Sequence, residues 1–90
     1  MGTMLIKIKL MPNGTETLLN ELQTKVKPII ETAEGKNVKF EEEPIAFGLK
    51  ALIAGFELDE KCELESIENK LAELEEVTSA TVADMRRAFG

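Results

Sequence analysis

The chain has 90 residues, with 11 basic and 17 acidic side chains and a formal net charge of -6. A chain of this length has room for one hydrophobic core, so we expect a single domain over residues 1–90. The acidic balance repels phosphate backbones, which argues against direct nucleic-acid binding, and the single cysteine, Cys62, excludes an intrachain disulfide and a multi-cysteine metal site.

The first half of the chain predicts a strand, a helix and a second strand. Residues 4–11 alternate with the period of two of a half-buried strand, and Pro12-Asn13-Gly14 ends it with turn chemistry. Thr15 can cap an amphipathic helix, in which Pro28 would kink or end the last turn. Alternation resumes after residues 34–35 and predicts the second strand. The apolar positions of the helix are Leu18, Leu22, Val26 and Ile29 or Ile30, and those of the second strand are Val38 and Phe40.

The second half predicts a third strand, a second helix and a last strand over residues 77–87. The inward positions are Leu52, Ala54, Phe56 and Leu58 in the third strand, Leu64, Ile67, Leu71 and Leu74 in the helix, and Ala80 and Val82 in the last strand. The order βαββαβ predicts an α+β fold, a ferredoxin-like two-layer sandwich with two helices on one face of a four-stranded antiparallel sheet.

The chemical inventory predicts no catalytic, cofactor or metal site. There is no His, Tyr or Trp, so Cys62 has no histidine base and is interpreted as a structural thiol. No Gly-rich phosphate-binding motif occurs. Glu41, Glu42 and Glu43 alternate between strand faces, so at most two could meet at a cation. We interpret this run as solvated charge that blunts a sheet edge or meets a basic partner.

Two segments are candidate interaction sites. Phe47 has the parity opposite to the inward positions of the third strand, so it is either an exposed docking anchor beside Pro44 and Ile45 or is buried by a curl of the strand. Both interpretations stay open. Arg86 and Arg87 suit phosphate or carboxylate oxygens. The pattern alone favours a solubilising end to an edge strand.

Two features bear on location. A single cysteine suits a reducing cytoplasm, and no long apolar stretch predicts a signal peptide or a membrane-spanning helix. We therefore expect a soluble cytoplasmic protein that does not contact membranes.

Two runs of sequence resemble a known family. The run Glu42-Glu43-Pro44-Ile45-Ala46-Phe47-Gly48-Leu49-Lys50-Ala51-Leu52 and the terminal Asp84-Met85-Arg86-Arg87 resemble the archaeal elongation factor 1-beta group. Its members are nucleotide exchange factors for elongation factor 1-alpha. The first strand, ending in Met11-Pro12, is similar too, and the resemblance covers essentially the whole chain. In eukaryotic relatives a lysine near the C-terminus reaches the partner's magnesium and phosphate site, and the aligned position here is Arg87, beside Arg86.

The resemblance implies a guanine nucleotide exchange factor of translation, a monomer when free, with no cofactor of its own and no enzymatic activity. It would dock the GDP-bound and nucleotide-free GTPase through Ile45, Phe47 and Lys50. It would disturb the GTPase's magnesium site through Arg86 or Arg87, and displacing that cation weakens GDP binding.

Other functions on the same fold are the alternatives. The main one is a ferredoxin-like regulatory module that binds a small-molecule effector, with a dimer interface as one place for the effector. An acyl-phosphate hydrolase lacks its Gly-rich loop here, and an RNA-recognition variant lacks its aromatic platform and basic face.

Overall fold

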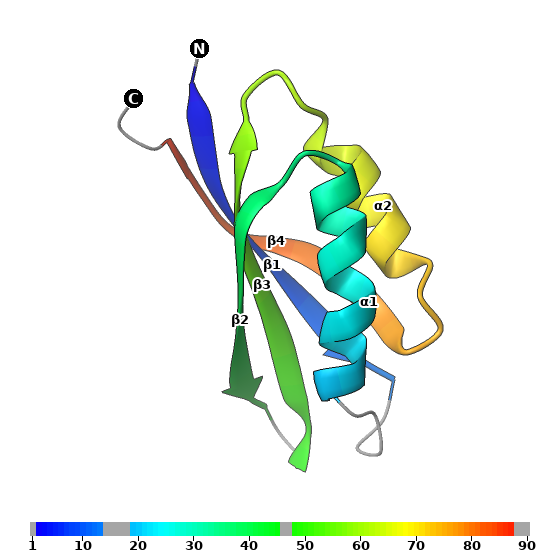
Figure 1. The fold of residues 1–90 in the computed structure, drawn as a ribbon. Helices are drawn as coiled ribbons and strands as arrows, with labels where there is room; N and C mark the ends of the chain where they lie inside the picture. Colours follow the sequence, from blue (N-terminus) through cyan, green and yellow to red (C-terminus); the bar gives the residue numbers. More distant parts are fainter. Residues whose placement is uncertain (1, 14–18, 46–47, 88–90) are drawn as a thin grey trace.

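The computed structural model describes residues 2–13, 19–45 and 48–87 of the chain. The elements are, in order, β1 (Thr3–Pro12), α1 (Leu19–Thr32), β2 (Lys36–Pro44), β3 (Lys50–Asp59), α2 (Leu64–Ala72) and β4 (Val77–Arg87). The four strands form one antiparallel sheet in the order β2-β3-β1-β4, and both helices cover one face of it (Figure 1). The predicted ferredoxin-like α+β fold is confirmed.

The core lies between the helices and the sheet, on the face that the alternation predicts. Each well-buried Leu, Ile or Phe contributes roughly 1.5–3 kcal/mol, so most of these positions matter in a domain of this size. The buried residues that form this cluster are Ile6, Ile8 and Leu10 of β1, Leu52, Ala54, Phe56 and Leu58 of β3, Leu22, Val26 and Ile30 of α1, Ile67 and Leu71 of α2, and Val77 of β4.

The structure decides two points that the sequence leaves open for helix α1, namely whether it ends at Pro28 and which isoleucine faces inward. Pro28 neither ends it nor shortens it, since α1 runs on to Thr32 with the proline ring exposed. Of the two candidate inward positions, Ile30 is fully buried and Ile29 only partly buried. The predicted cap Thr15 and the predicted apolar position Leu18 lie outside the described residues.

Both edge strands carry extra residues, one in β2 and two in β4. In β4, Asp84 pairs with Lys7 but Val82 pairs with Ile8, so Ala83 is one extra residue, and Thr78 is the other, near the start of the strand. In β2, Lys36 and Lys39 pair with Glu57 and Gly55, and Asn37 between them has a φ of 53°. A bulge increases the local twist and reverses the face on which later side chains lie.

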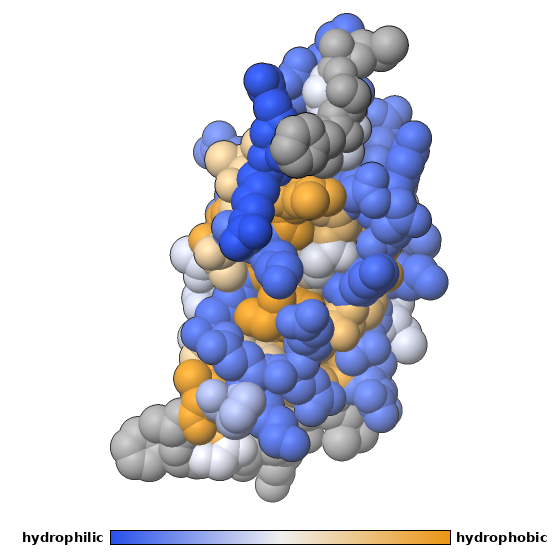
Figure 2. Space-filling view, turned by 90° about the vertical axis from the view of Figure 1, so that its left-hand side faces the viewer, coloured by the Kyte–Doolittle hydropathy of each residue, from blue (hydrophilic) through white to orange (hydrophobic). Residues whose placement is uncertain are grey.

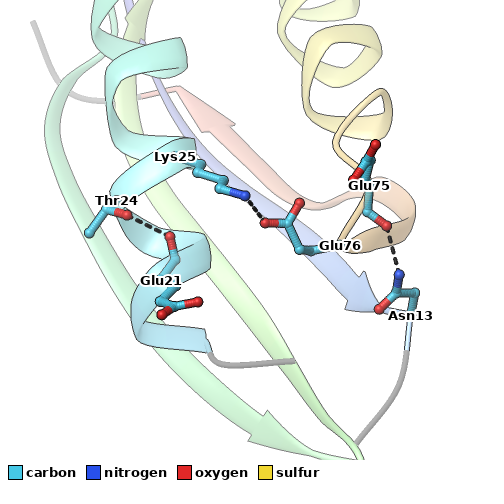
Figure 3. A network of polar contacts seen from close by, with 6 residues as sticks. All are labelled: Asn13, Glu21, Thr24, Lys25, Glu75 and Glu76. Atoms are coloured by element: carbon cyan, nitrogen blue, oxygen red, sulfur yellow. Dashed lines mark hydrogen bonds and ion pairs between the residues drawn. The ribbon is translucent and has the colours of Figure 1, made fainter. Parts of the chain in front are cut away.

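A polar network ties one end of the sandwich together (Figure 3). The Lys25 ammonium of α1 forms an ion pair with Glu76, in the connection between α2 and β4. This hydrogen bond lowers the pKa of the Glu76 carboxyl and raises that of Lys25. The Asn13 side chain donates to the Glu75 carbonyl at 2.7 Å, and its backbone N–H donates to the Glu76 carbonyl at 2.9 Å. These contacts fix the end of β1 and α1 against the start of β4.

No helix in the described part of the chain has the length and apolar character needed to cross a membrane.

Candidate protein-interaction site

The two predicted arginines lie at the end of β4. The Arg86 and Arg87 side chains are 75% and 73% exposed, and each forms one ion pair. Arg86 Nε lies 2.9 Å from Asp84 Oδ2, and Arg87 Nη2 lies 2.8 Å from Glu60 Oε2. Exposed ion pairs contribute roughly 0–1 kcal/mol. Both guanidiniums can therefore leave these carboxylates for another anion at small cost.

The two arginines are adjacent in β4 and so lie on opposite faces of the sheet, and the bulge at Ala83 decides which face each one takes. Arg86 pairs with Leu5, whose side chain is exposed on the face without helices, while Arg87 pairs with Met4, which packs against the core. Arg87 thereby reaches Glu60, whose backbone N–H donates to the Gly2 carbonyl at 3.0 Å. The two adjacent side chains thus have different surroundings, and strict alternation from Val82 along β4 would assign each of them to the other face.

The other predicted contact residues lie at the opposite end of the sheet. The Ile45 N–H donates to the Leu49 carbonyl at 2.7 Å, and Ile45 is partly buried. Lys50 is exposed, with its ammonium 3.8 Å from a Glu42 carboxylate oxygen. Phe47 lies outside the described residues, so its docking role stays a prediction. This end therefore presents one partly buried aliphatic residue and one exposed lysine.

The sheet separates the two groups of predicted residues. Arg86 is level with Glu57 through their common neighbour Leu5, and Lys50 lies seven residues before Glu57 along β3. At about 3.3 Å per residue, that spacing is roughly 23 Å. Figure 1 shows the end of β4 and the start of β3 at opposite ends of the molecule. The predicted residues thus form two separate candidate sites, an arginine site with Arg86 and Arg87 and a second site with Ile45 and Lys50.

The acidic run lies on the edge strand β2, which pairs only with β3. Glu41, Glu42 and Glu43 are all exposed, and two of them form ion pairs, Glu43 with Lys9 at 3.5 Å and Glu42 with Lys50 at 3.8 Å. Within the described ranges, no group of three acidic or cysteine side chains is arranged to hold a metal ion.

Cys62 precedes α2 and is partly buried against the core. Its thiol donates to Glu34 Oε2 at 3.3 Å. This hydrogen bond, together with desolvation and the charge of Glu34, raises the pKa of the thiol. A raised pKa reduces the thiolate fraction, which agrees with the structural role predicted for this residue.

The sheet face without helices carries a hollow of about 440 Å³ that the sequence analysis did not single out. Its centre is Gly55 of β3, flanked across the sheet by Lys7 of β1 and Lys39 of β2. In Figure 2, apolar surface on this face is surrounded by polar side chains. The available sequence signal was a glycine inside a run of strand-forming residues. The structure therefore defines a class of protein, a ferredoxin-like module. Its open sheet face and exposed charges are suited to contacts with another protein.

Comparison with known proteins places the chain within that class. The family model of the EF-1 guanine nucleotide exchange domain matches residues 5–88, so the chain belongs to this family. It is 40% identical over 88 residues to Elongation factor 1-beta of Methanosarcina barkeri, covering 97% of this chain and 99% of that protein. It is 37% identical over 89 residues to Elongation factor 1-beta of Methanocaldococcus jannaschii, covering 98% and 100%.

Proposed function

We propose that this chain is a guanine nucleotide exchange factor of translation that acts on elongation factor 1-alpha in the cytoplasm. The observation that carries the proposal is the match of the exchange-domain family over residues 5–88, supported by the near full-length relatives. An exchange factor binds the nucleotide-free GTPase preferentially. By thermodynamic linkage, the exchange factor lowers the GTPase's affinity for nucleotide by the same factor by which bound nucleotide lowers the GTPase's affinity for the exchange factor. GDP release and GTP rebinding therefore need no covalent chemistry and no cofactor on this chain.

The arginine site at the end of β4 is suited to the step that weakens the binding of GDP to the GTPase. A GTPase holds the diphosphate through Mg²⁺ and backbone N–H groups, so a cation placed among these groups competes with the metal for the phosphate oxygens. Arg86 and Arg87 are exposed and always charged, and their planar donors match such oxygens. We assign this step to one of them.

The second site, at the start of β3, is suited to docking the GTPase. Ile45 and Lys50 lie there, with Phe47 between them in the sequence. The sheet separates the two sites by roughly 23 Å. The factor can therefore bind one part of the GTPase with the second site while its arginines act on another part. Such a factor works as a monomer and contacts neither nucleic acid nor membrane.

The test is stopped-flow release of fluorescent GDP from elongation factor 1-alpha at increasing concentrations of this protein. The wild type should accelerate release. The variant Arg86→Ala/Arg87→Ala should lower the saturated rate at least about tenfold, which is about 1.4 kcal/mol of barrier, with a much smaller change in half-saturating concentration.

The matched control is Lys27→Ala/Lys70→Ala, which removes two exposed positive charges from the two helices. It should leave the saturated rate unchanged. No acceleration by the wild type would refute the proposed function, while acceleration that survives the double arginine substitution would refute the assignment of the arginines.

A further inference from the structure

Gly55 lies in the interior of β3, where nothing in the protein's own fold requires a glycine. It is not among the described residues with positive φ. An added Cβ would lie 3.8 Å from the Lys39 carbonyl oxygen and 3.9 Å from both the Ile6 carbonyl oxygen and Lys7 Cγ, which is ordinary van der Waals contact. Glycine nevertheless weakens a strand interior, and it often marks a place where a ligand or another backbone comes close.

The hollow around Gly55 has apolar walls along the strands. Ile53 precedes the glycine on the same face of β3, and Leu5 of β1 stands diagonally on the other side. Leu5 is 43% exposed, and among the described residues Met85 is the only other exposed large apolar residue. Together these residues leave a space bounded by two aliphatic side chains over bare β3 backbone.

Three cationic and three acidic side chains line the hollow, but two of the cations have no ion-pair partner among the described residues. On this face Lys9 is paired with Glu43, Arg86 with Asp84, and the Asn37 amide donates to the Glu57 carboxylate. Lys7 and Lys39 form no ion pair with any described residue, although the protein carries a net charge of -6. Glu41 lies at the rim, also without an ion pair among the described residues.

We infer that this hollow is a docking site for an apolar side chain of the GTPase that has a carboxylate next to it in the same segment. The inference rests on the proposed function. The apolar side chain fits over the Gly55 backbone between Leu5 and Ile53, and the carboxylate meets the ammonium groups of Lys7 and Lys39. A desolvated apolar anchor with complementary charge beside it is the usual centre of a protein interface.

The hollow also extends along the sheet face to the arginine site at the end of β4. Arg86 and Asp84 form its end on the β4 side. A partner seated over Gly55 therefore lies against Arg86 as well, so this additional docking site adjoins one of the arginines assigned to the magnesium site.

The first arm of the test fills the hollow with Gly55→Val. Valine favours strands, so the melting temperature should stay the same or rise by a few degrees. The half-saturating concentration for GDP release should rise at least about tenfold while the saturated rate is unchanged, because only docking is weakened. If this variant melts lower than the wild type, Gly55→Ala replaces it, with a smaller rise expected. Wild-type half-saturation in a stable filled variant would overturn the inference.

The second arm reverses the unpaired charges with Lys7→Glu/Lys39→Glu. Half-saturation should rise at least about tenfold, whereas the control Lys27→Glu/Lys70→Glu, with the same change in net charge, should raise it less than about threefold. Equal effects of the two pairs would show that only long-range charge acts and would overturn the site.

Direct binding to nucleotide-free elongation factor 1-alpha, measured by calorimetry for every variant, separates the two proposals. A wild type that binds but does not accelerate release would refute the exchange function and leave the hollow to be judged by its variants. Unchanged binding in both hollow variants would refute the hollow alone.

Discussion

The replacement Gly35→Ala should be among the most damaging single-methyl changes in this protein. Gly35 ends α1 in a Schellman motif: Glu34 adopts a left-handed φ of 73° and its N–H donates to the Glu31 carbonyl at 3.0 Å, while the Gly35 N–H donates to the Ile30 carbonyl at 2.8 Å. An added Cβ at Gly35 would lie 2.2 Å from Ile30 Cγ2, 2.9 Å from the Ile30 carbonyl oxygen and 3.3 Å from Phe56 Cδ2.

None of these neighbours can yield cheaply. Ile30 is fully buried and Phe56 nearly so, and the Ile30 carbonyl is held by the hydrogen bond that closes the helix. Overpacking a core costs about 1–3 kcal/mol, and a clash with both a buried side chain and a backbone carbonyl places this variant near about 3 kcal/mol. At about 4–8 °C per kcal/mol for a domain of this size, the melting temperature should fall by roughly 12–24 °C.

The assay is urea unfolding followed by circular dichroism, with the free energy of unfolding taken from the midpoint and slope. The matched control is Gly55→Ala, which adds the same methyl group to the open face and should change the free energy by less than about 0.5 kcal/mol or stabilise slightly. Equal midpoints for the two variants would show that the Gly35 backbone relaxes freely, and the steric argument would be refuted.

Three further predictions concern stability and reactivity. Glu76→Gln should destabilise the protein at neutral pH but not in acid. The contact with Lys25 lowers the pKa of Glu76 in the folded protein. The stability that this contact provides is therefore present above the pKa of the unfolded chain and is lost as the pH falls through the pKa of the folded protein. The midpoint of urea unfolding, measured as a function of pH for both proteins, checks this prediction. Glu34→Gln should speed alkylation of Cys62 by iodoacetamide at constant pH, because Glu34 raises the pKa of the thiol; an unchanged rate contradicts it. Pro28→Ala restores a helical N–H donor and should stabilise α1 by about 1–3 kcal/mol in urea unfolding, whereas a loss would show that the proline is preferred.

Periodicity predicted the fold because the core is built from positions that repeat locally. The alternation in β1 predicts Met4, Ile6, Ile8 and Leu10 as inward positions; Met4 is partly buried and the other three are buried. Every inward position predicted in β3 from Leu52 to Leu58 is buried, since each of these strands has one face on the helices. In β4 the predicted inward pair Ala80 and Val82 is only partly buried, because an edge strand has a neighbour on one side only.

The bulges could not be predicted in the same way. The extra residue Ala83 exists only relative to β1, a strand more than seventy residues earlier in the chain, and residues 83–87 contain neither glycine nor proline to mark it. Nothing local therefore indicates that the alternation reverses there. The φ of 53° at Asn37 is easier to explain, because asparagine tolerates the left-handed region better than most residues.

The candidate site was predictable in kind but not in arrangement. Arginines at the end of one strand and a lysine at the start of another can be recognised as exposed from sequence. Their separation of roughly 23 Å depends on the antiparallel register of three strands. The hollow is harder still, because its lining comes from all four strands and its centre is a missing side chain.

The paired arginines lie on opposite faces of β4, and the bulge at Ala83 places Arg86 on the open face. Arg86 shares the open face with the Gly55 hollow, whereas Arg87 lies on the helix side and is held by Glu60. Because β4 is an edge strand, no other strand in the described part of the chain covers its outer side, and an approaching protein can reach both faces there. In the complex that we propose, a GTPase seated on the hollow meets Arg86 directly and reaches Arg87 only around the strand edge, after the Glu60 pair opens. The duplication of the arginine thus provides one cation for each side of the same edge.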